Sequence, residues 1–215
     1  TRSCAGMIQE SPPINLSSAN LFGKYDPDEK LEPFFDLLTE ENRRVNLVSR
    51  ETKRDDLRRL AAESLAPLDW IGEKRYRSYL DIGSGGGFPS IPIMTAAVAG
   101  VIEIEQVRLI ERTQKRAAAL GRIILGLNLQ AEIVAEDFPG KDTSLKFDLV
   151  TLRYVKLTPK LLTAIFKSLH RSGLFIYYSQ PEFALDRHQF AAVNQSFTLD
   201  LKEPPRPVTF FRNLC

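Results

Sequence analysis

Residues 81–90 read Asp-Ile-Gly-Ser-Gly-Gly-Gly-Phe-Pro-Ser, and this stretch is the most informative part of the chain about its class of fold. An apolar run at 79–82 leads into it, and a helical pattern at about 91–99 follows it. Glycine adopts positive φ without strain and lets a ligand approach the backbone closely. Glycines between a strand and a helix are typical of the turn where an open parallel sheet binds nucleotide-like molecules. The stretch therefore predicts an α/β domain whose ligand lies against this turn.

Short apolar runs alternate with helical patterns around this stretch. Runs typical of strands lie at 79–82, 107–110, 131–134, 147–152 and 174–178. Helical patterns at about 91–99, 114–125 and 159–170 separate most of them. This alternation predicts the α/β class, with a doubly wound, mostly parallel sheet that is covered on both faces. Near the C-terminus, 197–201 and 208–212 flank a Pro-Pro-Arg-Pro turn, which predicts an antiparallel hairpin at the sheet edge.

The N-terminal part of the chain has a different pattern. Residues 1–27 are loop-like, with Pro12, Pro13 and Pro27, and we expect a mobile arm there. From 28 to 77 apolar residues recur at steps of three and four, which predicts a helical extension with its second helix at about 53–71. Residues 78–215 are then expected to form the ligand-binding domain.

Composition limits the class of protein. The apolar content of 43% and the charged content of 26% are those of an ordinary globular chain. The 29 basic residues exceed the 27 acidic ones by a net charge of only +2, so affinity for nucleic acid requires a local patch. Cys4 and Cys215 have no metal-ligand spacing around them, and we expect no metal and a reducing cytoplasm. No run is long enough to span a membrane, and we expect no export signal.

The glycine spacing narrows the choice of ligand. The pattern is Gly-x-Gly-x-Gly at Gly83, Gly85 and Gly87, and Phe88 stands where the dinucleotide fingerprint has its third glycine. The Gly-Lys-Ser/Thr sequence of a phosphate-binding P-loop is absent from the chain. The pattern therefore disfavours both common nucleotide motifs.

Two carboxylates complete the ligand prediction. Asp81 enters the glycine turn, where a negative charge suits a cationic sulfonium and an α-ammonium group better than a pyrophosphate. Glu111 closes the next strand, where an acidic side chain can accept hydrogen bonds from both ribose hydroxyls. Together they indicate S-adenosyl-L-methionine. A nicotinamide site, or a turn that binds nothing beside a solvated Glu111, remains the alternative.

Four strings carry a family resemblance: NLVSR at 46–50, LDIGSGGGFP at 80–89, KR at 115–116 and FDLVTLR at 147–153. They resemble the RsmG/GidB family of small-subunit ribosomal RNA guanine-N7 methyltransferases, over about residues 31 to 178. The Gly-Phe-Pro ending of the second string is fairly specific to this family. The resemblance implies a Rossmann-like class I methyltransferase fold, and ribosomal RNA or the small ribosomal subunit as partner. We expect a monomer.

The resemblance also suggests site residues. Those expected at the cofactor are Asp81, Gly83, Ser84, Gly85, Gly87, Phe88, Glu111, Arg112, Glu136 and Asp137. Those expected on the RNA side are Arg59, Lys115, Arg116, Arg153 and Tyr154, with Arg153 as the catalytic residue. The Arg153 fork suits a phosphate or the guanine O6 edge, and Tyr154 suits stacking on an extruded base. A salt bridge is the alternative for Arg153, and an ordinary core or surface position for Tyr154.

The chain departs from the family at three places. The family's Arg-His-x-x-Asp-Ser stretch reads Arg-Leu-Ala-Ala-Glu-Ser at 59–64, its Arg-Ala-Glu element reads Val-Ala-Glu-Asp at 134–137, and its Lys-Gly pair is replaced by Ser179 and Gln180. A methyltransferase acting on another RNA or on a small molecule therefore stays open, as does a non-catalytic ribosome-assembly factor.

The proposed chemistry makes few demands on side chains. Guanine N7 carries a lone pair and no proton, so its methylation needs positioning and no general base. We expect His170 and His188 to lie outside the site. A basic group comprises Arg108, Arg112, Lys115, Arg116 and Arg122, and we expect part of it to form one stripe that contacts phosphates.

Overall fold

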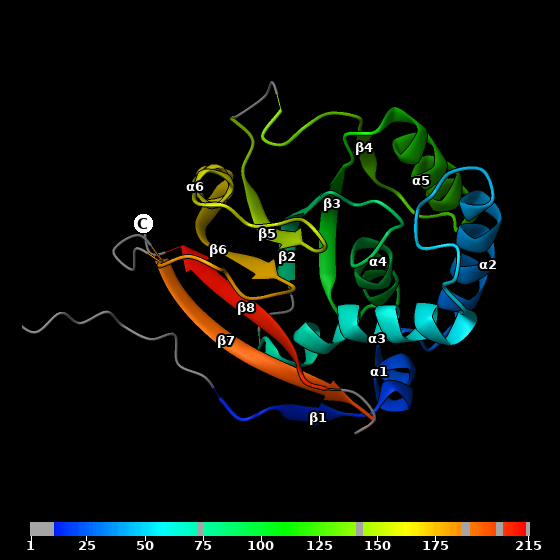
Figure 1. The fold of residues 1–215 in the computed structure, drawn as a ribbon, viewed down its shortest axis with the longest axis horizontal. Coiled ribbons are helices and arrows are strands. Elements are labelled where there is room, and N and C mark those ends of the chain that lie inside the picture. Colours follow the sequence, from blue (N-terminus) through cyan, green and yellow to red (C-terminus); the bar gives the residue numbers. More distant parts are fainter. Residues whose placement is uncertain (1–10, 73–74, 141–143, 186–189, 201–203, 214–215) are drawn as a thin grey trace, which may run out of the picture.

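The computed structural model describes residues 11–72, 75–140, 144–185, 190–200 and 204–213. Its parallel strands are β2 (Arg75–Ile82), β3 (Glu103–Ile110), β4 (Glu132–Val134), β5 (Phe147–Leu152) and β6 (Leu169–Tyr177). Beside them lie β1 (Ile14–Leu16), β7 (Phe190–Leu199) and β8 (Arg206–Asn213). Within the described residues these strands form one sheet in the order β1-β7-β8-β6-β5-β2-β3-β4 (Figure 1). The predicted mostly parallel sheet is confirmed.

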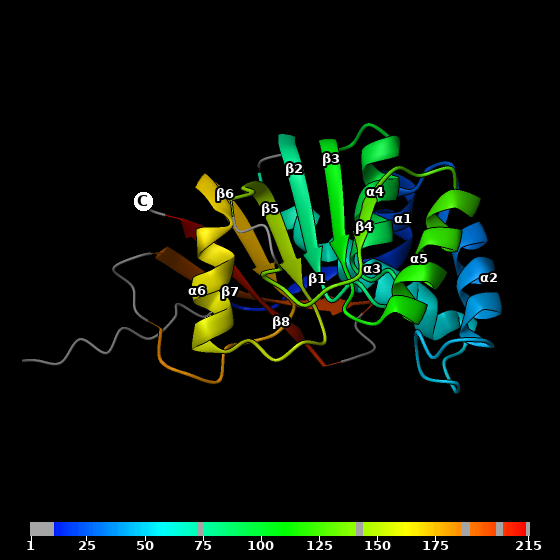
Figure 2. The same cartoon turned by 90° about the horizontal axis from the view of Figure 1, so that it is seen from above.

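The strand order reverses in the middle of the sheet. From β2 the chain moves outward to β3 and β4, then returns to β5 on the other side of β2 and continues to β6. The parallel strands end at the same edge, as their arrowheads show in Figure 2. In such sheets a ligand crevice opens at the reversal point, beyond the carboxyl ends of the strands. The fold therefore places the crevice beyond the ends of β2 and β5.

Helices cover the two faces of the sheet unequally. On one face α3 (Arg54–Trp70), α4 (Ser90–Val98) and α5 (Gln114–Gly126) contact the sheet, and α1 (Ser18–Tyr25) and α2 (Leu31–Asn42) pack against these helices. The other face packs against α6 (Pro159–Lys167), through buried side chains that include Leu162 and Ile165. The helices at about 91–99, 114–125 and 159–170 were thus predicted to within three residues at each end.

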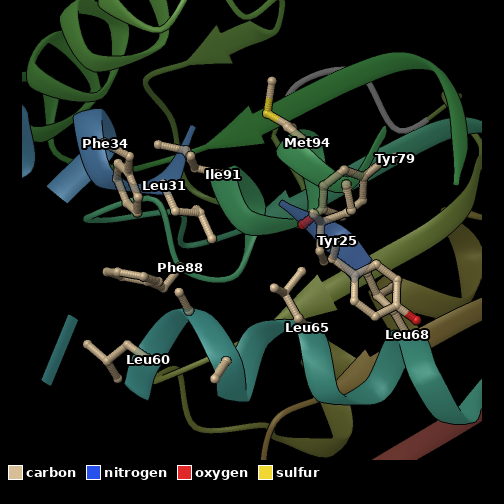
Figure 3. Close-up of a cluster of buried hydrophobic side chains, with 14 of the residues drawn as sticks. Tyr25, Leu31, Phe34, Leu60, Leu65, Leu68, Tyr79, Phe88, Ile91 and Met94 are labelled. Atoms are coloured by element: carbon tan, nitrogen blue, oxygen red, sulfur yellow. The ribbon is translucent and has the colours of Figure 1, made fainter. Parts of the chain in front are cut away.

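The helix α3 connects the helical extension to the glycine turn. Its leucines recur on one face, and Leu60, Leu65 and Leu68 point toward Phe88 and Tyr25 (Figure 3). The Phe88 ring packs against Phe34 of α2 with 5.1 Å between centroids. Burial of several such side chains, each contributing about 1.5–3 kcal/mol, fixes the extension against the domain.

The described part of the expected mobile arm is ordered into β1 and α1. The strand β1 pairs in parallel with β7 and supplies partners to backbone groups that an edge strand would leave exposed. The helix α1 buries Leu21 and Tyr25, and the Tyr25 hydroxyl lies 3.1 Å from Asp69 of α3. The composition of this segment could not reveal these contacts, because the partners, β7 and α3, come much later in the sequence. Residues 1–10 lie outside the described residues.

The C-terminal hairpin is antiparallel, as predicted, but it does not lie at the sheet edge. The strands β7 and β8 pair from Phe190 with Asn213 to Phe197 with Arg206, and β8 also pairs with β6. The outermost strand on this side is β1. The difference matters for the site, since β8 brings Arg206 close to the carboxyl end of β6.

Candidate active site

A cavity of 530 Å³ lies at the carboxyl ends of β2, β3 and β5. All but two of the residues expected at the cofactor line it. These are Gly83, Ser84, Gly85, Phe88, Glu111, Arg112, Glu136 and Asp137. The remaining two, Asp81 and Gly87, lie behind its wall.

The glycine turn forms one wall of the cavity with its backbone. Gly83 has φ of 75° and Gly85 has φ of 49°, the left-handed region that L side chains rarely adopt. The Gly83 amide donates to the Ile110 carbonyl at 2.8 Å, which ties the turn to the end of β3. A Cβ on Gly85 would lie 3.7 Å from Arg116 and 4.0 Å from Glu111, both of which line the cavity. The absence of a side chain at Gly85 therefore keeps this space open.

Gly87 serves packing instead. Its φ is 88°, and a Cβ there would lie 2.5 Å from the Ile91 side chain. It does not line the cavity. The cofactor contact that we expected for Gly87 has no support in this geometry, because the residue faces the start of α4.

Asp81 ends β2 beneath the glycine turn, with 1% of its surface exposed. Its Oδ1 accepts a 2.6 Å hydrogen bond from the Thr151 hydroxyl, and its Oδ2 is buried without a partner among the described residues. Burial raises the pKa of Asp81 to about 6, although the hydrogen bond from Thr151 acts in the opposite direction. A buried polar atom without a partner is uncommon in proteins. The Oδ2 atom is therefore suited to a ligand donor or cation.

Glu111 connects the glycine turn to the start of α5. Its Oε2 accepts from the Gly85 amide at 3.2 Å, and its Oε1 accepts from the Thr113 amide at 2.9 Å. A carboxylate has about four acceptor positions, so each oxygen can accept one more hydrogen bond. Since Glu111 lines the cavity, a diol could bind there without displacing either amide.

The string at 46–50 contributes to the same cavity, between α2 and α3. The Leu47 and Val48 amides donate to the Asn42 side-chain oxygen at 2.8 and 3.0 Å, which orders the loop. Leu47 and Val48 line the cavity, and Arg116 donates to the Leu47 carbonyl at 3.1 Å. Sequence reasoning missed these two residues as cavity residues, although the string had been singled out as a family motif.

Two members of the basic group on β3 and α5 are paired with acidic side chains. Arg108 makes two hydrogen bonds to Glu132 of β4, and Arg122 makes two to Glu41 of α2. These acidic partners come from other elements, so the local sequence did not reveal them. Arg116 lines the cofactor cavity, 4.0 Å from Glu111.

Two further cations of that group are exposed, as is Arg122 despite its pairing with Glu41. Arg112 and Lys115 are exposed, and Arg112 also lines the cavity. The cationic surface offered to RNA beside the cofactor is thus smaller than the sequence suggests.

Arg153 follows β5, is 5% exposed and lies between two cavities. One guanidinium nitrogen donates to the Leu60 carbonyl at 3.0 Å and to the Ser64 hydroxyl at 2.9 Å. The other forms an ion pair with Glu63 of α3. The salt bridge that remained as an alternative for Arg153 is present.

Tyr154 stands at the mouth of the cavity. It is 77% exposed, and its φ is 57°. The Arg153 guanidinium lies 4.9 Å from the ring centroid and donates to the hydroxyl at 3.3 Å. Large side chains at positive φ are uncommon and cluster at functional sites. An exposed ring held in this way offers a flat surface to an incoming aromatic base.

A second cavity, of 370 Å³, adjoins the first and shares Arg153 and Tyr154 with it. Arg59 lines it and lies 3.1 Å from Glu63, so its expected position on the substrate side is compatible with the structure. Arg206 of β8 and Tyr178 after β6 also line it, and sequence reasoning missed both. No local pattern marks them, because the hairpin brings Arg206 to α3 and the end of β6 brings Tyr178 to it.

The remaining candidates lie elsewhere. His170 is exposed on β6 and lines neither cavity, whereas His188 lies outside the described residues. In the part of the chain that the structure describes, no helix combines the length and the apolar character needed to cross a membrane.

Comparison with known proteins places the chain among methyltransferases. The family described as rRNA small subunit methyltransferase G matches residues 27–202. A protein named ribosomal RNA small subunit methyltransferase G from Bacillus pumilus is 30% identical over 69% of this chain and 62% of its own length. One of the same name from Cereibacter sphaeroides is 28% identical over 93% of this chain and 91% of its own length.

Solved structures share the fold at low identity. A methyltransferase from Pyrococcus furiosus superposes with a TM-score of 0.56 at 14% identity, covering 71% of this chain and 82% of that chain. The T. thermophilus 16S rRNA methyltransferase RsmC, in complex with AdoMet and guanosine, superposes with a TM-score of 0.52 at 17% identity, covering 77% and 44%. The predicted class of fold is therefore confirmed.

Proposed function

The chain belongs to the rRNA small subunit methyltransferase G family, and on this premise we propose that it transfers a methyl group from S-adenosyl-L-methionine to N7 of a guanosine in small-subunit ribosomal RNA. One observation carries the proposal: a side-chain-free glycine turn and the Glu111 carboxylate border one cavity at the reversal point of the sheet, and the unpartnered Oδ2 of Asp81 is buried behind its wall. We further propose that it acts in the cytoplasm, as a monomer, on the small ribosomal subunit or its RNA.

The residues around the cavity fit this cofactor. Glu111 would accept hydrogen bonds from the ribose hydroxyls, and the open side of Gly85 would face the same group. Asp81 would compensate the positive charge of the methionine part, because its Oδ2 has no other partner among the described residues. Glu136 and Asp137 line the far wall, beyond β4, and would border the adenine. When bound, the cofactor supplies an electrophilic methyl group.

The residues beyond β5 would position the acceptor. Tyr154 would stack on the target base at the mouth of the cavity, since 77% of its surface is exposed there. Arg153 would act as a positioning residue, because its donors already bind Leu60, Ser64 and Glu63 and its guanidinium lies against the Tyr154 ring. This revises the catalytic role that the sequence suggested for Arg153.

The cavity walls agree with an acceptor that carries no proton. Among the described residues that line the two cavities there is no histidine or cysteine. Guanine N7 needs no base at the moment of attack, so holding it in line with the methyl group supplies most of the rate enhancement. A rigid platform such as Tyr154 is sufficient for that purpose.

A methyl-transfer assay tests the proposal. The purified chain would be supplied with cofactor carrying a labelled methyl group, and either with naked small-subunit rRNA or with small subunits from cells that lack this modification. We expect label in RNA from at least one of the two, at one guanosine, in a form that cleaves as 7-methylguanosine under reduction and aniline. Label at another atom would reject the N7 assignment, and no label in either substrate would reject the proposed function.

A further inference from the structure

The second cavity is built from four separate parts of the fold. α3 contributes Arg59 and Glu63, the segment after β5 contributes Arg153 and Tyr154, and further walls come from the end of β6 and from the β7–β8 hairpin. Its volume of 370 Å³ falls within the range of about 300–1,000 Å³ that is usual for ligand pockets. Because it shares a wall with the cofactor cavity, a molecule seated in it would lie beside the methyl acceptor.

Three arginines converge on one carboxylate in this cavity. Glu63 Oε1 lies 3.1 Å from Arg59 and 3.7 Å from Arg206, and Oε2 pairs with Arg153. Among the described residues that line the cavity, Glu63 is the one acidic residue. The three arginines therefore exceed the acidic side chains of the wall by two charges, and Asp56, which does not line the cavity, lies 3.5 Å from Arg59. Charges in such a recess act through a partly apolar surrounding and attract anions more strongly than the same charges on an open surface.

The three arginines differ in what they can offer. The Arg153 side chain is 5% exposed, and its donors are directed at Leu60, Ser64 and Glu63. The Arg59 and Arg206 side chains are 31% and 53% exposed. A guanidinium has five N–H donors in a planar fork that matches two oxygens of a phosphate. Glu63 thus orients the guanidinium groups of Arg59 and Arg206, and both side chains remain partly exposed to solvent.

We propose that the second cavity binds a backbone phosphate of the RNA substrate beside the target guanosine, through Arg59 and Arg206. The inference rests on the proposed function. Tyr154 links the two cavities, so a base stacked on its exposed ring has its sugar and phosphate within reach of the second cavity. The apolar residues Phe197 and Val208, which also line this cavity, suit the carbon face of a ribose. Glu63 holds the arginines and does not touch the RNA.

The test removes either one phosphate charge from the RNA or one arginine charge from the protein. A short single-stranded RNA with one guanosine is prepared in its natural form and with a neutral methylphosphonate at each linkage near that guanosine. Binding is measured with the wild-type chain, saturated with S-adenosylhomocysteine, and with Arg206→Ala. Arg212→Ala is the matched control, since Arg212 lies on the same strand, is exposed and lines neither cavity. Arg206→Lys is included because it keeps a positive charge near Glu63.

We expect one linkage at which the methylphosphonate weakens RNA binding by the wild type and by Arg212→Ala about tenfold. At the same linkage it should weaken binding by Arg206→Ala less than threefold, and this difference is the coupling between Arg206 and that phosphate. The slope of log affinity against log salt should fall by about 0.7 for Arg206→Ala, the value for one phosphate contact on a single strand. Arg206→Lys should keep the slope and lose part of the affinity. If Arg206→Ala does not fold, the same comparison is made with Arg206→Lys, and a smaller loss at that linkage than in the wild type supports the proposal.

Equal losses at every linkage for wild type and for the Arg206 variants would overturn the proposal, as would the absence of measurable RNA binding by the wild-type chain. The control assay is methyl transfer. Normal transfer without coupling would reject the phosphate site alone. Coupling without any transfer would reject the proposed function while leaving an RNA-binding cavity.

Discussion

The two cavities share a wall but are built on different principles. The cofactor cavity is formed mainly by residues that follow β2, β3, β4 and β5, together with Leu47 and Val48, and the backbone of its glycine turn is bound by Glu111. The second cavity is formed by side chains from α3, the segment after β5, the end of β6 and the β7–β8 hairpin, and Glu63 pairs with arginines from three of these parts. The first depends on backbone conformation within a short stretch, and the second on an ion-pair cluster assembled from distant segments. Substitutions in the cofactor cavity and in the second cavity should therefore have different effects.

The largest effect should come from the glycine turn. Gly85→Val places a branched side chain at φ of 49° and into the cavity, so S-adenosylhomocysteine should bind at least about 100-fold more weakly, as measured by calorimetry. Gly100→Val is the matched control, since Gly100 also has positive φ, at 71°, but has open space around it. Equal loss in both variants would mean that strain, and not the cavity, explains the effect.

A large effect of a different kind should follow from Arg153→Ala. The change leaves Glu63 with one ion-pair partner fewer and should cost about 3 kcal/mol of unfolding free energy in denaturant titrations. Methyl transfer should fall strongly, while cofactor affinity changes less than threefold. Arg153→Lys should recover part of the stability and little of the transfer, because lysine lacks the planar fork that contacts Tyr154. Weakened cofactor binding would show that Arg153 also contributes to the cofactor cavity and that its effects on the two cavities cannot be separated.

A moderate effect should follow from Glu111→Gln. The amide keeps one oxygen for a backbone N–H but loses the charge, so cofactor affinity should fall about tenfold, or about 1.4 kcal/mol. Glu132→Gln on the neighbouring strand serves as the control and should leave affinity unchanged. Calorimetry distinguishes the two, and equal affinities would remove Glu111 from the ribose contact.

The smallest effect should be a pH dependence of cofactor binding. The folded-state pKa of Asp81 is raised to about 6 from the ordinary 3.8, so the folded protein takes up a proton between about pH 4 and 6 and loses stability as the pH rises through this window. A cationic ligand favours the ionised carboxylate. Affinity should therefore rise, by about tenfold at most, between pH 5 and 7.

Asp81→Asn should abolish this rise, because the amide does not titrate. Binding by the wild type below pH 6 should also release a proton, which appears in calorimetry as a heat that depends on the buffer. Affinity that falls from pH 5 to 7 would contradict the charge role of Asp81.

The parallel strands, the glycine turn and the two carboxylates beside it could all be predicted from the sequence. Each of these depends on residues close together in the chain: apolar runs form the strands, and Gly83 and Gly85 permit the backbone angles of the turn. Backbone preferences act locally, so a linear pattern is enough to reveal them.

Which arginines are paired with carboxylates, and which can face a ligand, depends on contacts between distant segments of the chain. Arg108 and Arg122 are neutralised by Glu132 and Glu41, whereas Arg206 reaches Glu63 across 143 positions (206 − 63) of the chain. An ion pair depends on distance in space, and charge alone says nothing about which partner will be near. The same reason hid β1 and α1, whose burial depends on strands and helices that come much later in the sequence.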